Sequence, residues 1–424
     1  WNGSSQWRPS SAPSGSPGLA DPPPPVIAGV LITEALTRND APPPPDTIEL
    51  HNPTEQPAEV GGWWLTDDFN TPAKFRIPNG TSIAPLDYLT FDATQFGAGD
   101  AGFGLGADGD EVWLFSADAA GQLTGYVHGH RFGAADDGVS FGLHVTSDGQ
   151  EHFVAQSAPT LGTANAGPQV GPVVISEIMY HPSGGDDGTD CSGDEYIEIV
   201  NISAEVVPLF AADRPTNTWR VRGGVDFDFP TDLTLAGGEY ILLVNFNPTN
   251  TALTAAYRSK YTVDASVRLF GPFSGKLDNS GETIGLLKPA VSGADVVAHV
   301  LTDRIDYGDA APWPGGADGS GQSLQRVDLG AFGNEPANWI AASPSAARRL
   351  IPTLVIQMQP SILLMAWEDS PVAWVLEEAA EITGPADWQS SAVQPVLSGG
   401  YWRVTVPRTA TTSAFYRLRL NVEH

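Results

Sequence analysis

Basic residues are scarce in this chain of 424 amino acids. It has 21 lysines and arginines against 50 aspartates and glutamates, so its formal net charge is −29 at pH 7. A surface of that sign repels the phosphates of nucleic acids and of anionic bilayers. We therefore expect no nucleic-acid partner, and we expect the surface to attract cations, Ca²⁺ in particular.

Sulfur and long apolar runs are also scarce. The only cysteine, Cys191, cannot form an internal disulfide, and there are three methionines. The chain has no run of about 20 apolar residues, so membrane insertion is not expected. These features are typical of a secreted bacterial protein at the cell surface whose signal sequence has been removed, and a cytosolic protein can share them.

Catalytic motifs are missing as well. The sequence has no Gly-x-Ser-x-Gly elbow, no His-Glu-x-x-His pair and no phosphate-binding loop ending in Gly-Lys. Many carboxylates are present, but no spacing selects two of them as a glycosidase pair. The sequence predicts a protein that is not an enzyme.

What the sequence does contain is β-strand pattern. The stretches Val173–Tyr180 and Glu195–Asn201 flank a Gly/Asp loop, and in the second one Ile197 and Ile199 share a face opposite Glu198. The 46 glycines and 36 prolines favour many short strands with turns over long helices.

The same pattern occurs earlier in the chain. Leu31–Leu36 and Thr47–Asn52 repeat it, with Glu34 at the place of Glu177. Further matches follow in the same order: residues 75–91 correspond to 227–243, and residues 105–114 correspond to 277–286. Two related units in tandem are therefore expected.

The second unit resembles the bacterial lamin tail domain, an immunoglobulin-like β-sandwich. The likeness rests on its strands 175–182 and 195–201, on Gly281–Ile284, and on a closing stretch with Asp318–Leu324 and Pro336–Trp339. The first unit is more divergent, with Phe153 in place of the closing Trp339 and Ser140-Phe141 in place of Ser323-Leu324. The resemblance implies a fold and no enzymatic activity.

These observations predict an all-β chain of tandem immunoglobulin-like β-sandwich domains joined by short Pro/Gly-rich linkers. The first domain is expected at residues 25–167 and the second at 168–350. Residues 351–424 are expected to form a small seven-strand sandwich, similar to a fibronectin type III module in Trp367, Trp374 and Tyr416.

Residues 1–24 have two interpretations. Their Pro, Ser and Gly content is typical of a linker. The string from Trp7 to Pro13 also resembles the closing strands at 153–159 and 339–344, which would make the segment the last strand of a preceding domain. Such a strand can pair with an open sheet edge on another copy of the chain.

Two groups of residues are candidate metal ligands. An acidic, glycine-rich loop supplies hard oxygen ligands for Ca²⁺, although its spacing is not that of an EF-hand and a solvated loop has the same composition. His128 and His130 lie two apart in an expected strand, with His144 and His152 on nearby strands, and could bind Zn²⁺ or Cu²⁺ or be hydrogen-bonded surface histidines. The carboxylates of the acidic loop are Asp186, Asp187, Asp190, Asp194 and Glu195.

Tryptophans are the candidate contact residues, and they bear on two classes of function. The first class is a structural or adhesive cell-surface protein, the self-assembling subunit of a filament, and the second is a glycan- or protein-binding module of a larger secreted polypeptide. Trp63, Trp64 and Trp313 would stack on sugars in the second class and be buried at contacts in the first. Trp7 is a candidate contact residue because a lone N-terminal strand cannot bury it. Because Trp63 and Trp64 are adjacent in a strand, one ring is expected in the core and the other outside.

Overall fold

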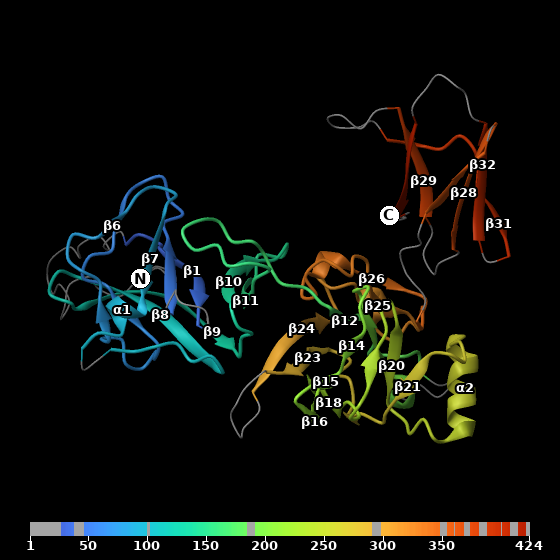
Figure 1. The fold of residues 1–424 in the computed structure, drawn as a ribbon, viewed down its shortest axis with the longest axis horizontal. Coiled ribbons are helices and arrows are strands. Elements are labelled where there is room, and N and C mark those ends of the chain that lie inside the picture. Colours follow the sequence, from blue (N-terminus) through green and yellow to red (C-terminus); the bar gives the residue numbers. More distant parts are fainter. Residues whose placement is uncertain are drawn as a thin grey trace, which may run out of the picture. The chain divides into compact units, whose positions relative to one another are not determined.

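The structure is a computed structural model, and almost everything that it describes is β-strand and connecting loop (Figure 1). This confirms the predicted all-β class. Two α-helices occur in the described segments, α1 (Ala93–Phe96) and α2 (Thr251–Tyr261), and neither is long and apolar enough to cross a membrane. The described segments are residues 27–37, 46–99, 102–184, 191–290, 298–347, 354–359, 361–368, 374–380, 388–399, 401–407 and 414–420.

Two compact units divide the chain. Unit 1 spans residues 1–144 and 152–168, and unit 2 spans residues 145–151 and 169–424. The chain passes from unit 1 to unit 2 after residue 168, and residues 145–151, in the hairpin between β10 (Ser140–Val145) and β11 (Glu151–Ala155), are also grouped with unit 2.

Unit 1 is a sandwich. Its remaining strands are β1 (Leu31–Leu36), β2 (Thr47–His51), β3 (Ala58–Glu59), β4 (Trp64–Thr66), β5 (Phe75–Arg76), β6 (Ser82–Ile83), β7 (Tyr88–Asp92), β8 (Gly109–Ala117) and β9 (Leu123–Gly133). The larger sheet has the order β11-β10-β1-β2-β7, the second sheet has the order β5-β4-β8-β9, and β3 pairs with β6. Ile32 and Leu50 from the larger sheet and Leu114 from the second share one buried cluster, so the core lies between the sheets.

Unit 2 begins with two larger sheets. Its first strands are β12 (Val173–Met179), β13 (Tyr196–Asn201), β14 (Val207–Pro208), β15 (Phe210–Ala211), β16 (Arg214–Thr218), β17 (Arg220–Gly223), β18 (Val225–Asp228), β19 (Thr234–Leu235), β20 (Tyr240–Val244), β21 (Arg268–Phe270), β22 (Ser274–Gly275), β23 (Gly281–Pro289), β24 (His299–Gly308), β25 (Ser323–Arg326) and β26 (Trp339–Ala342). One sheet has the order β21-β20-β13-β12-β25-β26 and the other β22-β18-β17-β23-β24, while β14 pairs with β19 and β15 with β16. Three short 3₁₀ helices, Ser192–Asp194, Gly315–Ala317 and Pro336–Asn338, interrupt the loops.

The strand orders of the two units correspond. The sequence β26-β25-β12-β13-β20 in unit 2 repeats β11-β10-β1-β2-β7 in unit 1, in the same antiparallel sense where the register is resolved. In both units the strand that closes the sandwich, β11 or β26, lies at the edge of its sheet.

Helix α2 gives unit 2 a second buried layer. Tyr257 and Tyr261 on the helix pack on Met179, Tyr196 and Leu242 of the sheet, in a cluster on the face opposite the main core. Figure 1 shows α2 beside the end of the sheet that carries β20 and β21. The Asn250 side chain caps the helix by accepting a hydrogen bond from Leu253 N at 3.2 Å.

The layer formed by α2 also explains why both faces of β13 are buried, which the alternation of its residues did not predict. All six residues of β13 are buried, including Glu198 on the face opposite Ile197 and Ile199.

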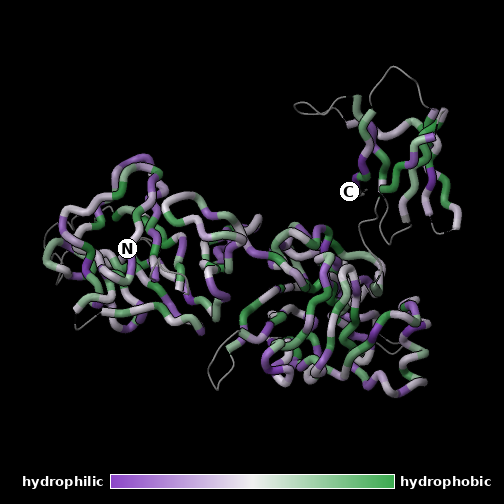
Figure 2. The backbone as a smooth tube through the Cα atoms, viewed as in Figure 1, coloured by the Kyte–Doolittle hydropathy of each residue, from purple (hydrophilic) through white to green (hydrophobic). Residues whose placement is uncertain are grey.

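Figure 2 shows hydrophobic segments along the strands and hydrophilic segments along many of the loops.

A smaller pair of sheets follows within unit 2. It contains β27 (Val355–Met358), β28 (Ile362–Glu368), β29 (Trp374–Ala379), β30 (Gln389–Ser390), β31 (Val396–Ser398), β32 (Tyr401–Pro407) and β33 (Phe415–Leu420), in the orders β27-β28-β32-β31 and β30-β29-β33. Met365, Trp367, Leu376 and Val404 form its buried core. The strands that the sequence predicts in this region are therefore present.

Candidate functional site

The two paired histidines lie on the inner face of β9. His130 is opposite Val112 and His128 is opposite Leu114 on β8, and the two rings meet edge to face with centroids 4.8 Å apart. A carboxylate that the sequence did not single out joins them. Glu151, the first residue of β11, brings an oxygen to within 4.8 Å of one nitrogen of each imidazole.

Both imidazoles have defined surroundings. Nδ1 of His128 accepts a hydrogen bond from Ile32 N at 2.9 Å, so this nitrogen carries no proton and the ring is neutral. The His130 ring stacks on Phe153, with centroids 4.5 Å apart and planes 5° from parallel. Burial, followed by the nearby His128, lowers the pKa of His130 to about 4. The buried Nε2 atom of His130 has no hydrogen-bond partner among the residues that the structure describes.

Unit 2 uses a different side chain at the corresponding place. There Ile175 N donates to Asp303 of β24 at 2.9 Å, as Ile32 N donates to His128 of β9. Asp303 also accepts from the buried guanidinium of Arg326 at 2.6 Å. A cation therefore faces this position in unit 2.

The other candidate histidines lie elsewhere. His144 is on β10 and His152 is on β11, next to Glu151, and neither belongs to the His128, His130 and Glu151 group. The signal that could have found Glu151 is its place beside His152, because successive strand residues point to opposite faces.

The last two carboxylates of the acidic loop each have a partner within the protein. Asp194 forms an ion pair with Lys260 at 2.6 Å. Glu195 is fully buried and accepts a hydrogen bond from Leu277 N at 2.9 Å. The other predicted calcium ligands, Asp186, Asp187 and Asp190, lie outside the described residues.

The tryptophans are largely core residues. Trp63 is 5% exposed in the unit 1 core, while Trp64 on the opposite face is half-buried and donates from Nε1 to Gly121 O at 3.1 Å. The expectation of one ring inside and one outside is confirmed. Trp313 packs on Trp339 in the unit 2 core, and Trp7 lies outside the described residues.

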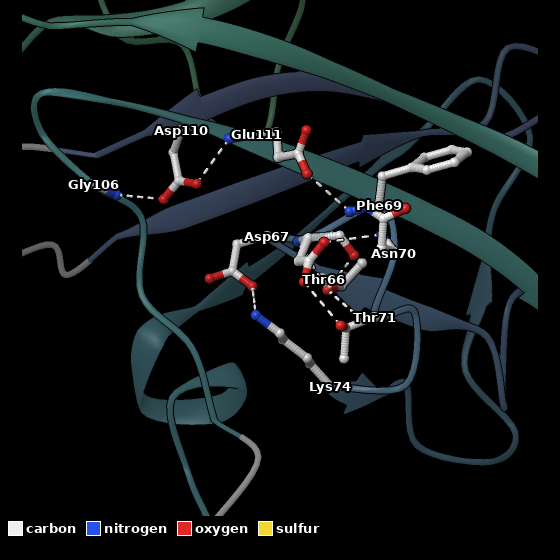
Figure 3. A network of polar contacts seen from close by, with 10 residues as sticks. Thr66, Asp67, Phe69, Asn70, Thr71, Lys74, Gly106, Asp110 and Glu111 are labelled. Carbon is white, nitrogen blue, oxygen red and sulfur yellow. Dashed lines mark hydrogen bonds and ion pairs between the residues drawn. The ribbon is translucent and has the colours of Figure 1, made fainter.

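Partly buried carboxylates near β8 fix loops. In the network of Figure 3, Glu111 accepts from Phe69 N at 2.9 Å, Asp110 accepts from Gly106 N at 2.7 Å, and Lys74 pairs with Asp67. These charges hold the 66–74 and 106–111 segments in place.

The most buried carboxylates of unit 1 form a pair across β1 and β2. Glu34 lies opposite Glu49 just after an irregularity in the register, and both are fully buried. Thr160 N donates to Glu34 at 2.9 Å, and Gly162 N donates to Glu49 at 2.5 Å. Burial raises the pKa of Glu49 to about 7, although the hydrogen bonds oppose this rise. The pair fastens the closing segment 160–162 onto the sheet.

Unit 2 repeats this arrangement. Glu177 lies opposite Glu198, again just after an irregularity, and they accept hydrogen bonds from Ser345 N and Ala347 N respectively. Burial and the neighbouring Glu177 raise the pKa of Glu198. The hydroxyl of Ser176 donates to Glu198 at 2.6 Å, as that of Thr33 donates to Glu49 at 2.7 Å.

An asparagine after the second strand repeats too. The Asn52 side chain donates to the carbonyls of Gln56, Ile83 and Ala84. In unit 2 the Asn201 side chain donates in the same way to the carbonyls of Glu205, Leu235 and Ala236. These buried polar groups build the fold.

Comparison with known proteins agrees with the fold of unit 1. The family model described as Lamin Tail Domain matches residues 23–130, which lie in the unit whose sequence departs further from that family's pattern. No curated protein matches the chain. A crystal structure of a DUF4876 family protein from Bacteroides thetaiotaomicron matches 64% of this chain and 84% of its own at 12% identity, with a TM-score of 0.26 that supports no conclusion. Over residues 23–130, then, the chain is similar to the lamin tail domain, an immunoglobulin-like β-sandwich.

Proposed function

We propose that the chain is a non-catalytic structural protein of the bacterial cell surface, in which two lamin-tail-like sandwiches and a small C-terminal sandwich act as rigid modules of a self-associating assembly. The observation that carries the proposal is the repeated pair of buried carboxylates, Glu34 with Glu49 and Glu177 with Glu198. Each pair accepts hydrogen bonds from the closing segment of its own sandwich.

Paired carboxylates with raised pKa values are usually the first candidates for acid–base catalysis. Here the four side chains are at most 2% exposed, so a substrate cannot reach them. Their oxygens accept hydrogen bonds from backbone N–H groups and hydroxyls of the same unit. A pair of this kind stabilises a fold and catalyses nothing.

Self-association is supported by the position of the closing strands. β11 and β26 lie at the edges of their sheets, and residues 1–24, whose sequence resembles these closing strands, lie outside the described residues. Edge strands carry unpaired N–H and C=O groups that can add a strand from another chain. We propose that the N-terminal segment of one copy adds to such an edge on the next copy.

The test is to image the purified chain by electron microscopy and to measure its sedimentation, in parallel with a variant that lacks residues 1–24. A variant with the same residues in scrambled order controls for length and composition. We expect filaments or higher oligomers from the intact chain and monomers from both variants. Assembly that is unchanged on deletion contradicts the proposal.

The same images decide between this function and a glycan- or protein-binding module. Isolated monomers of the intact chain, both with Ca²⁺ and with chelator, would favour the binding module, and a glycan screen would follow. The burial of Trp63 and Trp313 gives that alternative little support, because neither indole is presented to a sugar.

A further inference from the structure

We propose that the small C-terminal pair of sheets carries a contact between copies of the chain, in which β31 of one copy adds to β27 of the next. These are the two edge strands of one four-stranded sheet. Within the described part of the chain, no strand pairs with the outer edge of either. The contact deepens the proposed self-association, on which its role rests, but it does not use residues 1–24.

Exposed apolar side chains are concentrated on these two edges. Among the described residues, fourteen large apolar side chains are exposed, and six of them lie in this pair of sheets. Five of the six are on the edge strands, namely Val355, Ile356 and Met358 on β27 and Val396 and Leu397 on β31. Edge strands are usually protected by a charged residue or a proline, and neither strand contains one. Such a surface is typical of a contact site.

Three of these side chains belong to the inner face of the sheet. Ile356 pairs with the core residue Met365, and Leu397 pairs with Trp402, which packs on the core. Met358, two residues after Ile356, lies on the same face. The facing sheet has three strands and leaves the three side chains exposed. The apolar edge of a neighbouring copy would cover them.

The strand directions favour a second copy as the partner. Each neighbouring pair in the sheet is antiparallel, so β27 and β31 run in opposite directions. A second copy that is shifted across the sheet, without being turned over, therefore brings its β31 antiparallel to β27. Its inner face stays on the same side, so Leu397 of the second copy faces the same way as Ile356 and Met358. Repetition of this shift extends one continuous sheet.

The charge of this region also favours contact between identical copies. Residues 351–424 contain seven acidic and four basic residues, which gives a net charge of −3, whereas the whole chain carries −29. Two copies that meet through this region therefore repel each other less than copies that meet through the rest of the chain.

The contact is small. β27 has four residues and β31 has three, so their pairing buries less than the roughly 1,200 Å² of a stable interface. We therefore expect it to be too weak to join isolated copies at micromolar concentration. It acts between copies that residues 1–24 already hold together, because their effective concentration is high.

The test is sedimentation of the variant without residues 1–24, which keeps every described residue, from micromolar to millimolar concentration. Met358→Lys and Val396→Lys each place a charge on one edge, at side chains that are 71% and 66% exposed, so both variants should fold. Val206→Lys, at a residue that is 60% exposed just before β14, adds the same charge elsewhere and is the matched control. Thermal unfolding of each variant shows whether it is folded.

We expect the average mass to rise with concentration in the unsubstituted variant and in the control. Association should weaken at least about 10-fold in Met358→Lys and in Val396→Lys, because each must bury a charge. A mixture of the two should form pairs that do not extend, since one still offers β31 and the other still offers β27.

A mass that stays monomeric at every concentration overturns the proposal, even if the intact chain forms filaments. Loss of association in Met358→Lys but not in Val396→Lys would indicate a contact between two β27 strands and also overturns it. Association of the shortened chain, together with an intact chain that forms no filaments, would support the edge contact and contradict the role of residues 1–24.

Discussion

Replacement of Glu49 by glutamine should change how the stability of unit 1 depends on pH. In the wild type the fully buried Glu49 carboxyl accepts hydrogen bonds from Thr33 Oγ1 at 2.7 Å and from Gly162 N at 2.5 Å. Its pKa rises from 4.5 to about 7, mainly because burial disfavours the charged form, and the carboxylate of Glu34 opposite adds to the rise.

The sign of this pH dependence follows from the number of protons bound in the folded and unfolded states. Between pH 4.5 and pH 7 the folded protein holds a proton on Glu49 that the unfolded chain has lost, so the free energy of unfolding falls as pH rises. The contribution of Glu49 is fully present below pH 4.5 and is lost as pH rises through 7. At about 1.4 kcal/mol per pH unit, the whole change between pH 4.5 and pH 7 is about 3.5 kcal/mol.

Glutamine resembles the protonated carboxyl but offers only one acceptor oxygen. The Glu49→Gln variant should therefore lose about 1 kcal/mol at pH 5 through a missing hydrogen bond. At pH 8 it avoids the cost of a buried charge and should be up to about 2 kcal/mol more stable than the wild type. The two stability curves should cross between these pH values.

Urea titrations from pH 5 to pH 8 measure this crossing. Hydrogen exchange followed by mass spectrometry on peptides from β1 and β2 assigns the unfolding to unit 1 in the full chain. Glu111→Gln is the control, because Glu111 is a carboxylate of the same unit that binds an exposed loop amide. Parallel stability curves for the wild type and Glu49→Gln would refute the reasoning.

Substitutions at two buried ionisable residues of unit 2, Glu177 and Arg326, give two further predictions. Glu177→Ala leaves donors such as Tyr196 Oη and Ser345 N unpaired in the interior, so it should destabilise unit 2 by about 3 kcal/mol or more in urea titration. Glu177→Gln should cost less. A loss below about 1 kcal/mol for Glu177→Ala contradicts the role assigned to Glu177. Arg326→Met leaves the buried Asp303 without its ion-pair partner and should lower the free energy of unfolding by about 3–5 kcal/mol. Adding Asp303→Asn should recover most of this loss, because the double variant no longer buries an unpaired charge. An equally unstable double variant would show that Arg326 acts mainly through packing.

The strands could be read from the sequence because their signal is local. Alternation in residues 195–201 and the repeat in residues 31–52 correspond to β13, β1 and β2, and the strands of residues 354–420 also appear in the structure. A period of two over five to seven residues reports which side chains share a face, and no distant contact is needed to see it.

The pairing of Glu34 with Glu49 and of Glu177 with Glu198 was not evident from the sequence. The repeat aligned these residues, but their burial depends on segments far along the chain. Thr160 N reaches Glu34 across 126 residues, and Ser345 N reaches Glu177 across 168 residues. Alternation also could not show that α2 covers the second face of β13.

For the histidine cluster, too, the sequence determined some features and the tertiary structure determined others. The spacing of His128 and His130 placed both rings on one face of a strand, and this was determined by the sequence. Their burial, the hydrogen bond from Ile32 N and the approach of Glu151 depend on how β1 and β11 pack beside β9. The sequence by itself determined strands and faces, since these follow from neighbouring residues. Only the tertiary structure decided which faces are covered and which polar groups meet, because stacking of sheets joins residues that share no local pattern.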